Sequence, residues 1–400
     1  MKKSLFILLA LAFCLSACGA ATVPESEAPA AVTEETASTV ESAEATAIVG
    51  TLRRMDDCDN TGTVRYLQGV EGNGGNYADK GYIQQIDYTT AQQRRLFDTG
   101  EPAAFFQNCF VQGDTLHYIL RSEKSQILYS RNLVSGDTRT VPLGDAYYIG
   151  YLDDRYLYLF PAGYNEYTVM RRLDPATGEV EETNLPAQTT DICDADGSRF
   201  LITRLHSDLP MSSLQGEEQR TAALQNATVE YAWWDPADGS VETVLEEPYY
   251  GDREETGLEQ VRTYLGKADG KLYFFRASLQ GAGYANGRIE CCALDGSGAQ
   301  TVFAAQEGAN PLKQKGEIQW FVHSTGKTQI IYRLADSTQY EVPAKTEEEL
   351  IDPVALTDDG RVLLAKFDRS LEKGITYCLV SEMDYLAGNF TGTDVTPAED

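Results

Sequence analysis

Histidine, the side chain best suited to acid–base chemistry near neutral pH, is rare in this 400-residue chain. The only histidines are His117, His206 and His323. A metal site or a Ser-His-Asp triad would need these side chains to converge with partners that the sequence does not identify. The sequence also lacks the motifs of a nucleophile elbow, a phosphate-binding loop and a zinc-protease helix. We therefore expect no catalytic residue, no metal site and no cofactor.

Carboxylates are plentiful, because Asp and Glu together number 61. Residues 57–62, Asp-Cys-Asp-Asn-Thr-Gly, begin like a calcium-binding loop, but the twelfth position is Gln68 instead of a bidentate Glu. Two carboxylates on one surface could also serve a glycosidase. The sequence does not name two that must converge. A carbohydrate-active enzyme, either a glycoside hydrolase or a polysaccharide lyase, stays open as an alternative.

A ligand contact is predicted around Tyr249 and Tyr250, in a chain that has 23 tyrosines. An exposed aromatic pair can stack on a sugar or a peptide. Asp252 and Arg253 follow after Gly251 and would add polar contacts. The alternative is that the tyrosine pair folds back on the protein and only packs there.

The first eighteen residues predict export and attachment to lipid. Two lysines precede an apolar run from Leu5 to Leu15, which is too short to span a bilayer. Residues 15–19, Leu-Ser-Ala-Cys-Gly, resemble a bacterial lipobox with cleavage before Cys18. The Cys18 thiol would carry diacylglycerol and its amine a further chain such as palmitate, each buried methylene adding about 0.8 kcal/mol. We predict a signal peptide at 1–17 and a lipid-anchored, extracytoplasmic protein at the cell surface.

Residues 18–47 are expected to form a disordered acidic tether. From residue 19 to 47 there are six glutamates but no basic or aromatic residue. Such a segment cannot bury enough apolar surface to fold, and its charges extend it. The net charge of −28 disfavours a nucleic-acid partner. The expected partners are the membrane, through the lipid anchor, and a protein, peptide or glycan ligand; the protein itself is expected to be a monomer.

Six further cysteines show no spacing that defines a disulfide framework: Cys58, Cys109, Cys193, Cys291, Cys292 and Cys378. An exported chain can form disulfides, but we favour thiols that pack as small buried apolar groups. Cys291 and Cys292 are adjacent in a predicted strand, so their side chains should point to opposite faces of a sheet.

The rest of the chain repeats one unit of four short strands. Each unit contains a tight turn before an apolar strand, at Gly62, Gly113, Asp154, Gly197, Gly270, Gly316 and Gly360. Each then has a hairpin, at 82–97, 127–143, 167–185, 229–245, 288–303, 329–343 and 375–390. The turns are 41 to 51 residues apart, with one gap of 73. This period predicts an all-β fold, a single β-propeller of seven four-stranded blades over 48–391, with six or eight blades as alternatives. Residues 392–400 are left as an acidic tail.

The long gap places two insertions in the fourth unit. They cover residues 206–228, where a short helix is expected near 212–224, and residues 246–260. Insertions in a propeller lie on the faces of the disc, where ligands usually bind, although a surface insertion is also tolerated without any function.

The tandem pattern of strand, Asp-x-x-Gly-like turn and strand over residues 48–390 resembles bacterial lipoproteins with a TolB-like or low-density-lipoprotein-receptor-like β-propeller. Only one Trp-Asp pair, Trp234-Asp235, is present, whereas WD40 repeats need a recurring one. The resemblance carries over no functional residue except the lipobox Cys18. It implies a ligand-binding or protein-interaction scaffold, with an envelope assembly factor as a further alternative besides the enzyme.

Overall fold

The computed structural model describes residues 48–70, 80–102, 106–121, 125–144, 147–161, 166–209, 213, 216–250, 258–280, 283–346, 349–368 and 375–398. The expected signal peptide at 1–17 and tether at 18–47 lie outside the described residues. Within the described part of the chain, no helix is long and apolar enough to cross a membrane.

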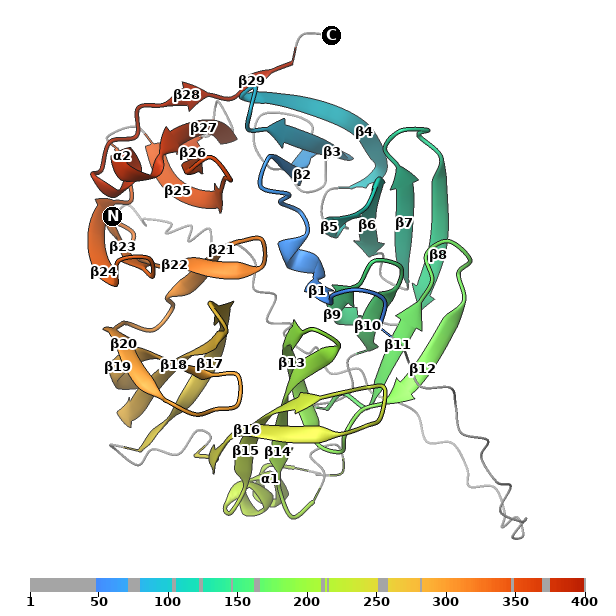
Figure 1. Cartoon of the computed structure of the whole chain (residues 1–400), viewed down its shortest axis with the longest axis vertical. Coiled ribbons are helices and arrows are strands. Elements are labelled where there is room, and N and C mark those ends of the chain that lie inside the picture. The colour runs from blue at the N-terminus through green and yellow to red at the C-terminus, as the bar shows by residue number, and fades with distance from the viewer. Residues whose placement is uncertain are drawn as a thin grey trace, which may run out of the picture. The chain divides into compact units, whose positions relative to one another are not determined.

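The described residues form seven sheets around one axis, which is a β-propeller (Figure 1). Blade 1 contains β2 (Val64–Val70), β3 (Lys80–Asp87), β4 (Gln92–Pro102) and β29 (Thr396–Pro397). Blade 2 contains β5 (Phe106–Gln112), β6 (Thr115–Arg121), β7 (Gln126–Asn132) and β8 (Thr138–Gly144). Blade 3 contains β9 (Tyr147–Leu152), β10 (Leu157–Pro161), β11 (Val169–Leu173) and β12 (Val180–Asn184), with β1 (Arg53–Arg54) added at its inner edge.

The other four blades follow the same order. Blade 4 contains β13 (Thr189–Asp196), β14 (Arg199–His206), β15 (Thr228–Trp234) and β16 (Val241–Pro248). Blade 5 contains β17 (Glu259–Ala268), β18 (Lys271–Gln280), β19 (Gly283–Ala293) and β20 (Gln300–Ala304). Blade 6 contains β21 (Asn310–Gln314), β22 (Glu317–Ser324), β23 (Thr328–Arg333) and β24 (Thr338–Pro343). Blade 7 contains β25 (Glu349–Leu356), β26 (Arg361–Asp368), β27 (Ile375–Ser381) and β28 (Thr393–Asp394). The predicted fold of seven four-stranded blades is confirmed.

The core lies between neighbouring blades, because each strand sends alternate side chains to opposite faces. Trp233 packs toward blade 5 and Trp234 toward blade 3, and both are buried. Cys291 and Cys292 divide in the same way, which confirms the prediction for this pair. All six cysteines of the propeller are buried and carry free thiols.

The C-terminal end differs from the expectation. The predicted hairpin at 375–390 is instead β27 followed by a short helix, α2 (Glu382–Leu386), whose N-cap Ser381 accepts a hydrogen bond from the Asp384 amide. β28 and β29 then lie within residues 392–400, which were expected to be a tail. β29 runs parallel to β4 at the outer edge of blade 1. The propeller therefore extends to Pro397, because the rim of blade 1 offers unpaired backbone groups to the last residues.

Residues 49–62, here called the axial segment, were not predicted to have any special place. Figure 1 shows β1 near the middle of the ring. β1 pairs with β9, and the 3-10 turn Met55–Asp57 follows. The chain then returns beside β2, where Asn60 bridges Arg65 and the Asp59 carbonyl accepts from the Tyr66 amide at 2.8 Å. This last part of the axial segment lies beside β2, in the position that a full inner strand takes in the other blades.

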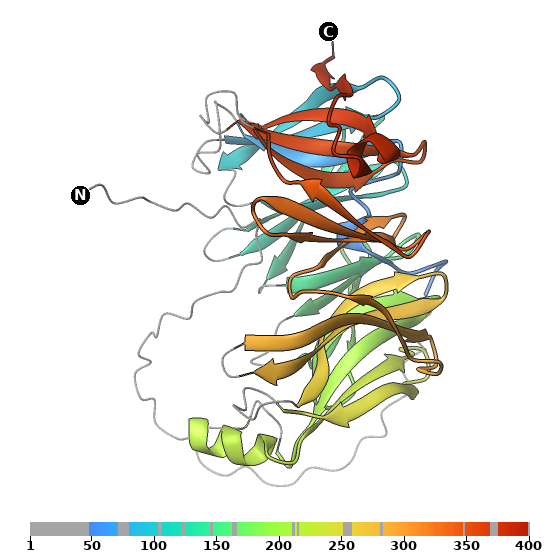
Figure 2. The same ribbon diagram turned by 90° about the vertical axis from the view of Figure 1, so that its left-hand side faces the viewer.

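The two ends of the strands define two faces of the disc. The turn face carries the short turns that join the first strand to the second in blades 2 to 7, such as those at Gly113, Gly270 and Gly360. The loop face carries α1 (Glu217–Leu224), inside the range predicted for a helix, and the end of β16. Figure 2 shows α1 and α2 on opposite sides of the propeller.

Candidate functional site

The site predicted from the sequence lies at the base of the blade 4 insertion. Tyr249 is half-buried and packs against Leu205 and Ala227, and its amide donates to the Ala227 carbonyl at 2.8 Å. The amide of Tyr250, also half-buried, donates to Gln260 Oε1 at 3.2 Å. Tyr249 therefore packs on the protein, as the alternative interpretation of the tyrosine pair expects. Asp252 and Arg253 lie outside the described residues, so the ligand contact stays a prediction.

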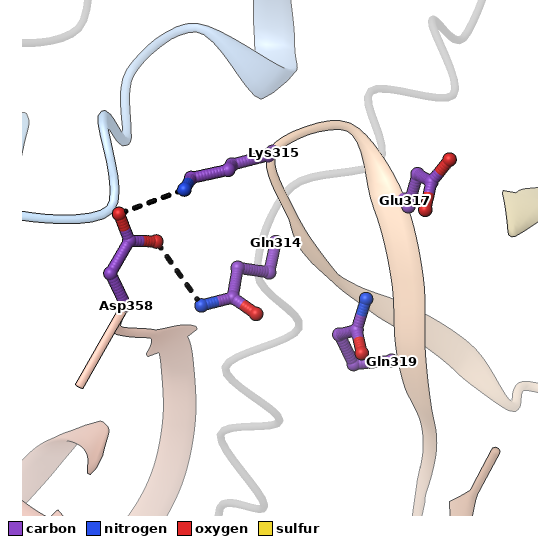
Figure 3. A pocket seen from close by; sticks show the side chains of 5 residues that line it. All are labelled: Gln314, Lys315, Glu317, Gln319 and Asp358. Atoms are coloured by element: carbon purple, nitrogen blue, oxygen red, sulfur yellow. Dashed lines mark hydrogen bonds and ion pairs between the residues drawn. The ribbon is translucent and has the colours of Figure 1, made fainter. Parts of the chain in front are cut away.

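A second place has the shape of a binding site. On the turn face, between blades 6 and 7, lies a pocket of about 440 Å³, and Figure 3 shows the five side chains that line it: Gln314, Lys315, Glu317, Gln319 and Asp358. A smaller cavity of about 160 Å³ shares three of these residues and continues toward Arg333, Arg361 and Glu382. We call the two together the blade 6–7 groove. Its volume lies in the range of small-molecule sites, roughly 300–1,000 Å³.

Local turn geometry positions the lysine of this groove. Lys315 and Gly316 join β21 to β22 with φ values of 52° and 82°. Two consecutive residues in this left-handed region make the tight hairpin turn that matches the twist of the strands. Gln314 and Glu317 are thereby paired across the hairpin. The turn directs Lys315 toward blade 7 (Figure 3).

Asp358 is held by groups from two directions. Its Oδ2 lies 2.9 Å from Lys315 Nζ, and its Oδ1 accepts from Gln314 Nε2 at 3.3 Å (Figure 3). The Asp358 amide donates to the Gly62 carbonyl at 3.0 Å. A side chain at Gly62 would collide with the Asp358 carboxylate. The axial segment therefore helps to fix one wall of the groove.

Two lining side chains are free to meet a ligand. Glu317 is exposed and Gln319 is half-buried. Neither side chain makes a hydrogen bond or an ion pair with any other residue of the described chain. Gln319 offers donors and an acceptor, and Glu317 offers acceptors. Both side chains can therefore exchange water for a ligand without breaking a hydrogen bond or an ion pair within the protein.

The smaller cavity has firmly held walls. Arg333 Nε donates to Glu382 Oε1 at 2.6 Å, and its Nη1 lies 2.8 Å from Asp336. Trp320 is buried and stacks on Tyr385, with ring centroids 5.7 Å apart. These contacts fix the position of the groove before any ligand arrives.

Near the axis, the carboxylates of the calcium-like loop have cationic partners. Asp57 lies 2.9 Å from Lys313, and Asp59 lies 3.0 Å from Arg65. Burial raises the pKa of both carboxyl groups, while the neighbouring cations act in the opposite direction. Among the described residues, no group of three or more His, Cys, Asp or Glu is arranged to hold a metal ion.

The groove was missed by the sequence analysis. Its two walls come from turns that the sequence did predict, at Gly316 and Gly360. These turns lie close together only because blades 6 and 7 are neighbours in the propeller. The signal that could have indicated the groove is the run of polar residues at successive predicted turns on one face.

Neither a protein-family model nor a curated protein matches the sequence. The propeller is similar to the β-propeller domain of the Trilobed protease from Pyrococcus furiosus, with a TM-score of 0.50, 10% identity, and coverage of 84% of this chain and 95% of that one. It is also similar to an oligogalacturonate lyase in complex with manganese, with a TM-score of 0.46, 14% identity, and coverage of 80% and 84%. TolB from Acinetobacter baumannii follows with a TM-score of 0.31, 14% identity, and coverage of 83% and 82%. At these identities the likeness is one of fold.

Proposed function

We propose that this chain is a lipid-anchored, extracytoplasmic binding protein whose propeller holds a ligand in the blade 6–7 groove without transforming it. The observation that carries the proposal is the groove itself, whose larger cavity is about 440 Å³ in volume and is lined by polar side chains, two of them uncommitted. The fixed walls around Asp358 and Arg333 support it, because a preorganised site loses less entropy on binding.

The enzyme alternative keeps one specific observation in its favour. Glu317 and Asp358 are two carboxylates that line the same pocket. A glycosidase needs one carboxyl group that can give up a proton and a second that acts as base or nucleophile. Asp358 is instead bound to Lys315 and Gln314, which suits a structural ion pair. Incubation with envelope polysaccharides and analysis for released fragments separates the two functions, since a binding protein releases none.

The anchor is supported by the lipobox and is tested at Cys18. Changing Cys18 to Ala removes the thiol that would carry diacylglycerol, so incorporation of an alkyne fatty acid into the protein should be lost and the protein should leave the membrane fraction. Cys58→Ala is the matched control, because that thiol is buried in the propeller. Unchanged labelling of the Cys18→Ala protein would rule out the lipid anchor.

Binding at the groove is tested with the full-length protein and material from the native envelope. A Gln319→Ala, Glu317→Gln double variant should retain less envelope material than the wild type, whereas a Tyr249→Ala, Tyr250→Ala variant tests the site on the loop face in the same assay. Loss of retention only in the tyrosine variant would place the ligand on the loop face.

A further inference from the structure

We propose that the blade 6–7 groove recognises a neutral saccharide; this inference rests on the binding function proposed above and names its ligand class. Three properties of the groove point to it: its balanced charge, its polar lining and its uncommitted amide and carboxylate.

The charged side chains that line the groove within the described chain balance one another, although the chain as a whole carries a net charge of −28. Its lining contains three cations and three carboxylates, namely Lys315, Arg333, Arg361, Glu317, Asp358 and Glu382. Two of the carboxylates are neutralised inside the groove, Asp358 by Lys315 at 2.9 Å and Glu382 by Arg333 at 2.6 Å. An anionic ligand would have to compete with Asp358 and Glu382 for their cations, whereas a neutral ligand leaves both pairs intact.

Among the residues that the structure describes, no apolar or aromatic side chain lines the larger cavity. Most drug-like and peptide ligands gain their affinity from apolar surface packed into a pocket, and this cavity offers them little. Trp320 borders the smaller cavity, but it is 1% exposed and stacks on Tyr385. The ligand that fits is one whose own surface is mostly hydrogen-bonding groups.

Hydroxyl groups match what the groove leaves uncommitted. A hydroxyl donates one hydrogen bond and accepts others, while an amide both donates and accepts and a carboxylate only accepts. Gln319 and Glu317 both belong to β22 and line the same cavity. Neighbouring hydroxyls of one sugar ring can engage both, and Lys315 can donate to a third oxygen at the rim.

The test is saturation-transfer NMR and titration calorimetry on the full-length protein in detergent. The probes are neutral oligosaccharides of glucose, mannose and N-acetylglucosamine, with oligogalacturonate, chitosan oligomers and a polar peptide as charged and non-sugar arms. At least one neutral oligosaccharide should bind. Gln319→Ala should weaken it at least about fivefold, the loss of one hydrogen bond, and Glu317→Gln should weaken it in the same direction.

The matched controls come from the neighbouring hairpin of the same blade. Gln339→Ala and Glu341→Gln change the same residue types at exposed positions of β24, outside the groove, and should leave affinity unchanged. Because Glu317 is exposed, its variant reports on binding even where Gln319→Ala disturbs folding. Groove-dependent binding of a charged oligosaccharide in place of the neutral ones would overturn the neutrality of the ligand, and groove-dependent binding of the peptide would overturn the saccharide class; either result keeps the binding function. Absence of any groove-dependent binding would overturn both.

Discussion

At the scale of single residues, burial decides which charged pairs hold this propeller together. Lys313 pairs with Asp57 and Lys315 pairs with Asp358, both at 2.9 Å and from the same hairpin. The side chains of the first pair are 16% and 17% exposed, whereas those of the second are 66% and 32% exposed. Water can solvate Lys315 and Asp358 if the pair breaks, but it cannot easily reach Asp57.

We predict that Lys313→Gln destabilises the protein by about 3–5 kcal/mol, because it leaves a buried carboxylate without its cation. Lys315→Gln, the matched control, should cost about 0–1 kcal/mol. Burial raises the pKa of Asp57 and Lys313 opposes this, so the variant should raise the pKa further. A carboxyl group whose pKa is raised in the folded state lowers the stability of the protein as pH rises through that pKa. The deficit of Lys313→Gln should therefore shrink on acidification, as measured by urea unfolding at two pH values.

His117 gives a second residue-scale prediction. It is buried, its Nδ1 lies 2.9 Å from Ser130 Oγ, and it stacks on Phe110. Burial lowers the pKa of His117 to about 4, against about 6.5 in an unfolded chain. The unfolded state thus takes up the proton first, and stability falls by up to roughly 3 kcal/mol as pH drops between those values.

His117→Gln keeps a polar partner for Ser130 but cannot take up a proton. Its free energy of unfolding should change less between pH 6.5 and 4 than that of the wild type, while stability at pH 7 changes little by comparison. Equal pH slopes for the two proteins would show that His117 titrates freely.

At the scale of elements, the turns were predictable because their residues act locally. In the turn after β11, the Asp174 carboxylate accepts from the Ala176 and Thr177 amides, and Gly178 adopts a φ of 84°. Asp and Gly at these positions predict the turn from local sequence alone, because they act on the backbone of the turn itself. The first six predicted hairpins coincide with strand pairs of the structure for this reason.

The axial segment and the groove could not be predicted in the same way, because their partners are remote in sequence. Asp57 meets Lys313 across 256 residues, and Lys315 meets Asp358 only because two blades are neighbours. The axial segment has no repeat of its own, so nothing local distinguishes it from a linker. Likewise, β29 contains only two residues, too few to show a strand pattern.

The tyrosine pair provides the prediction at this scale. Tyr249 packs against Leu205 and Ala227 beneath α1, so Tyr249→Ala should cost about 1–2 kcal/mol for partial loss of an aromatic contact. Tyr250→Ala should stay within about 0.5 kcal/mol, as expected away from the core. Urea unfolding of the two single variants measures this difference. If the insertion also binds ligand, the double variant should weaken binding by at least about 1 kcal/mol, and unchanged affinity would assign the pair to packing alone.

At the scale of the whole molecule, the two ends of the propeller close it in different places. The axial segment links several blades from the centre: its backbone contacts include Leu52 with Gly197, Cys58 with Val111 and Gly62 with Asp358. The C-terminal residues link blade 7 to blade 1 at the rim, through β28 on β27 and β29 on β4. A ring whose first and last blades are not joined exposes both of their facing surfaces, so each link acts on the whole fold.

We predict that a chain ending at Thr391 is less stable than the full-length protein by roughly 3 kcal/mol. The truncation removes the pairing of β28 with β27 and, in addition, three backbone hydrogen bonds outside that ladder, from the amides of Val395, Thr396 and Ala398 at 2.9, 3.1 and 2.8 Å. Each contributes about 0.5–1.5 kcal/mol, and the packing of Val395 between the two blades is lost as well. A chain ending at Ala398 is the control, since it keeps all three bonds and loses only two residues. Urea unfolding should separate the two truncations, with the shorter one unfolding at lower urea. Coincident transitions would show that packing between blades 7 and 1 closes the ring without the C-terminal strands.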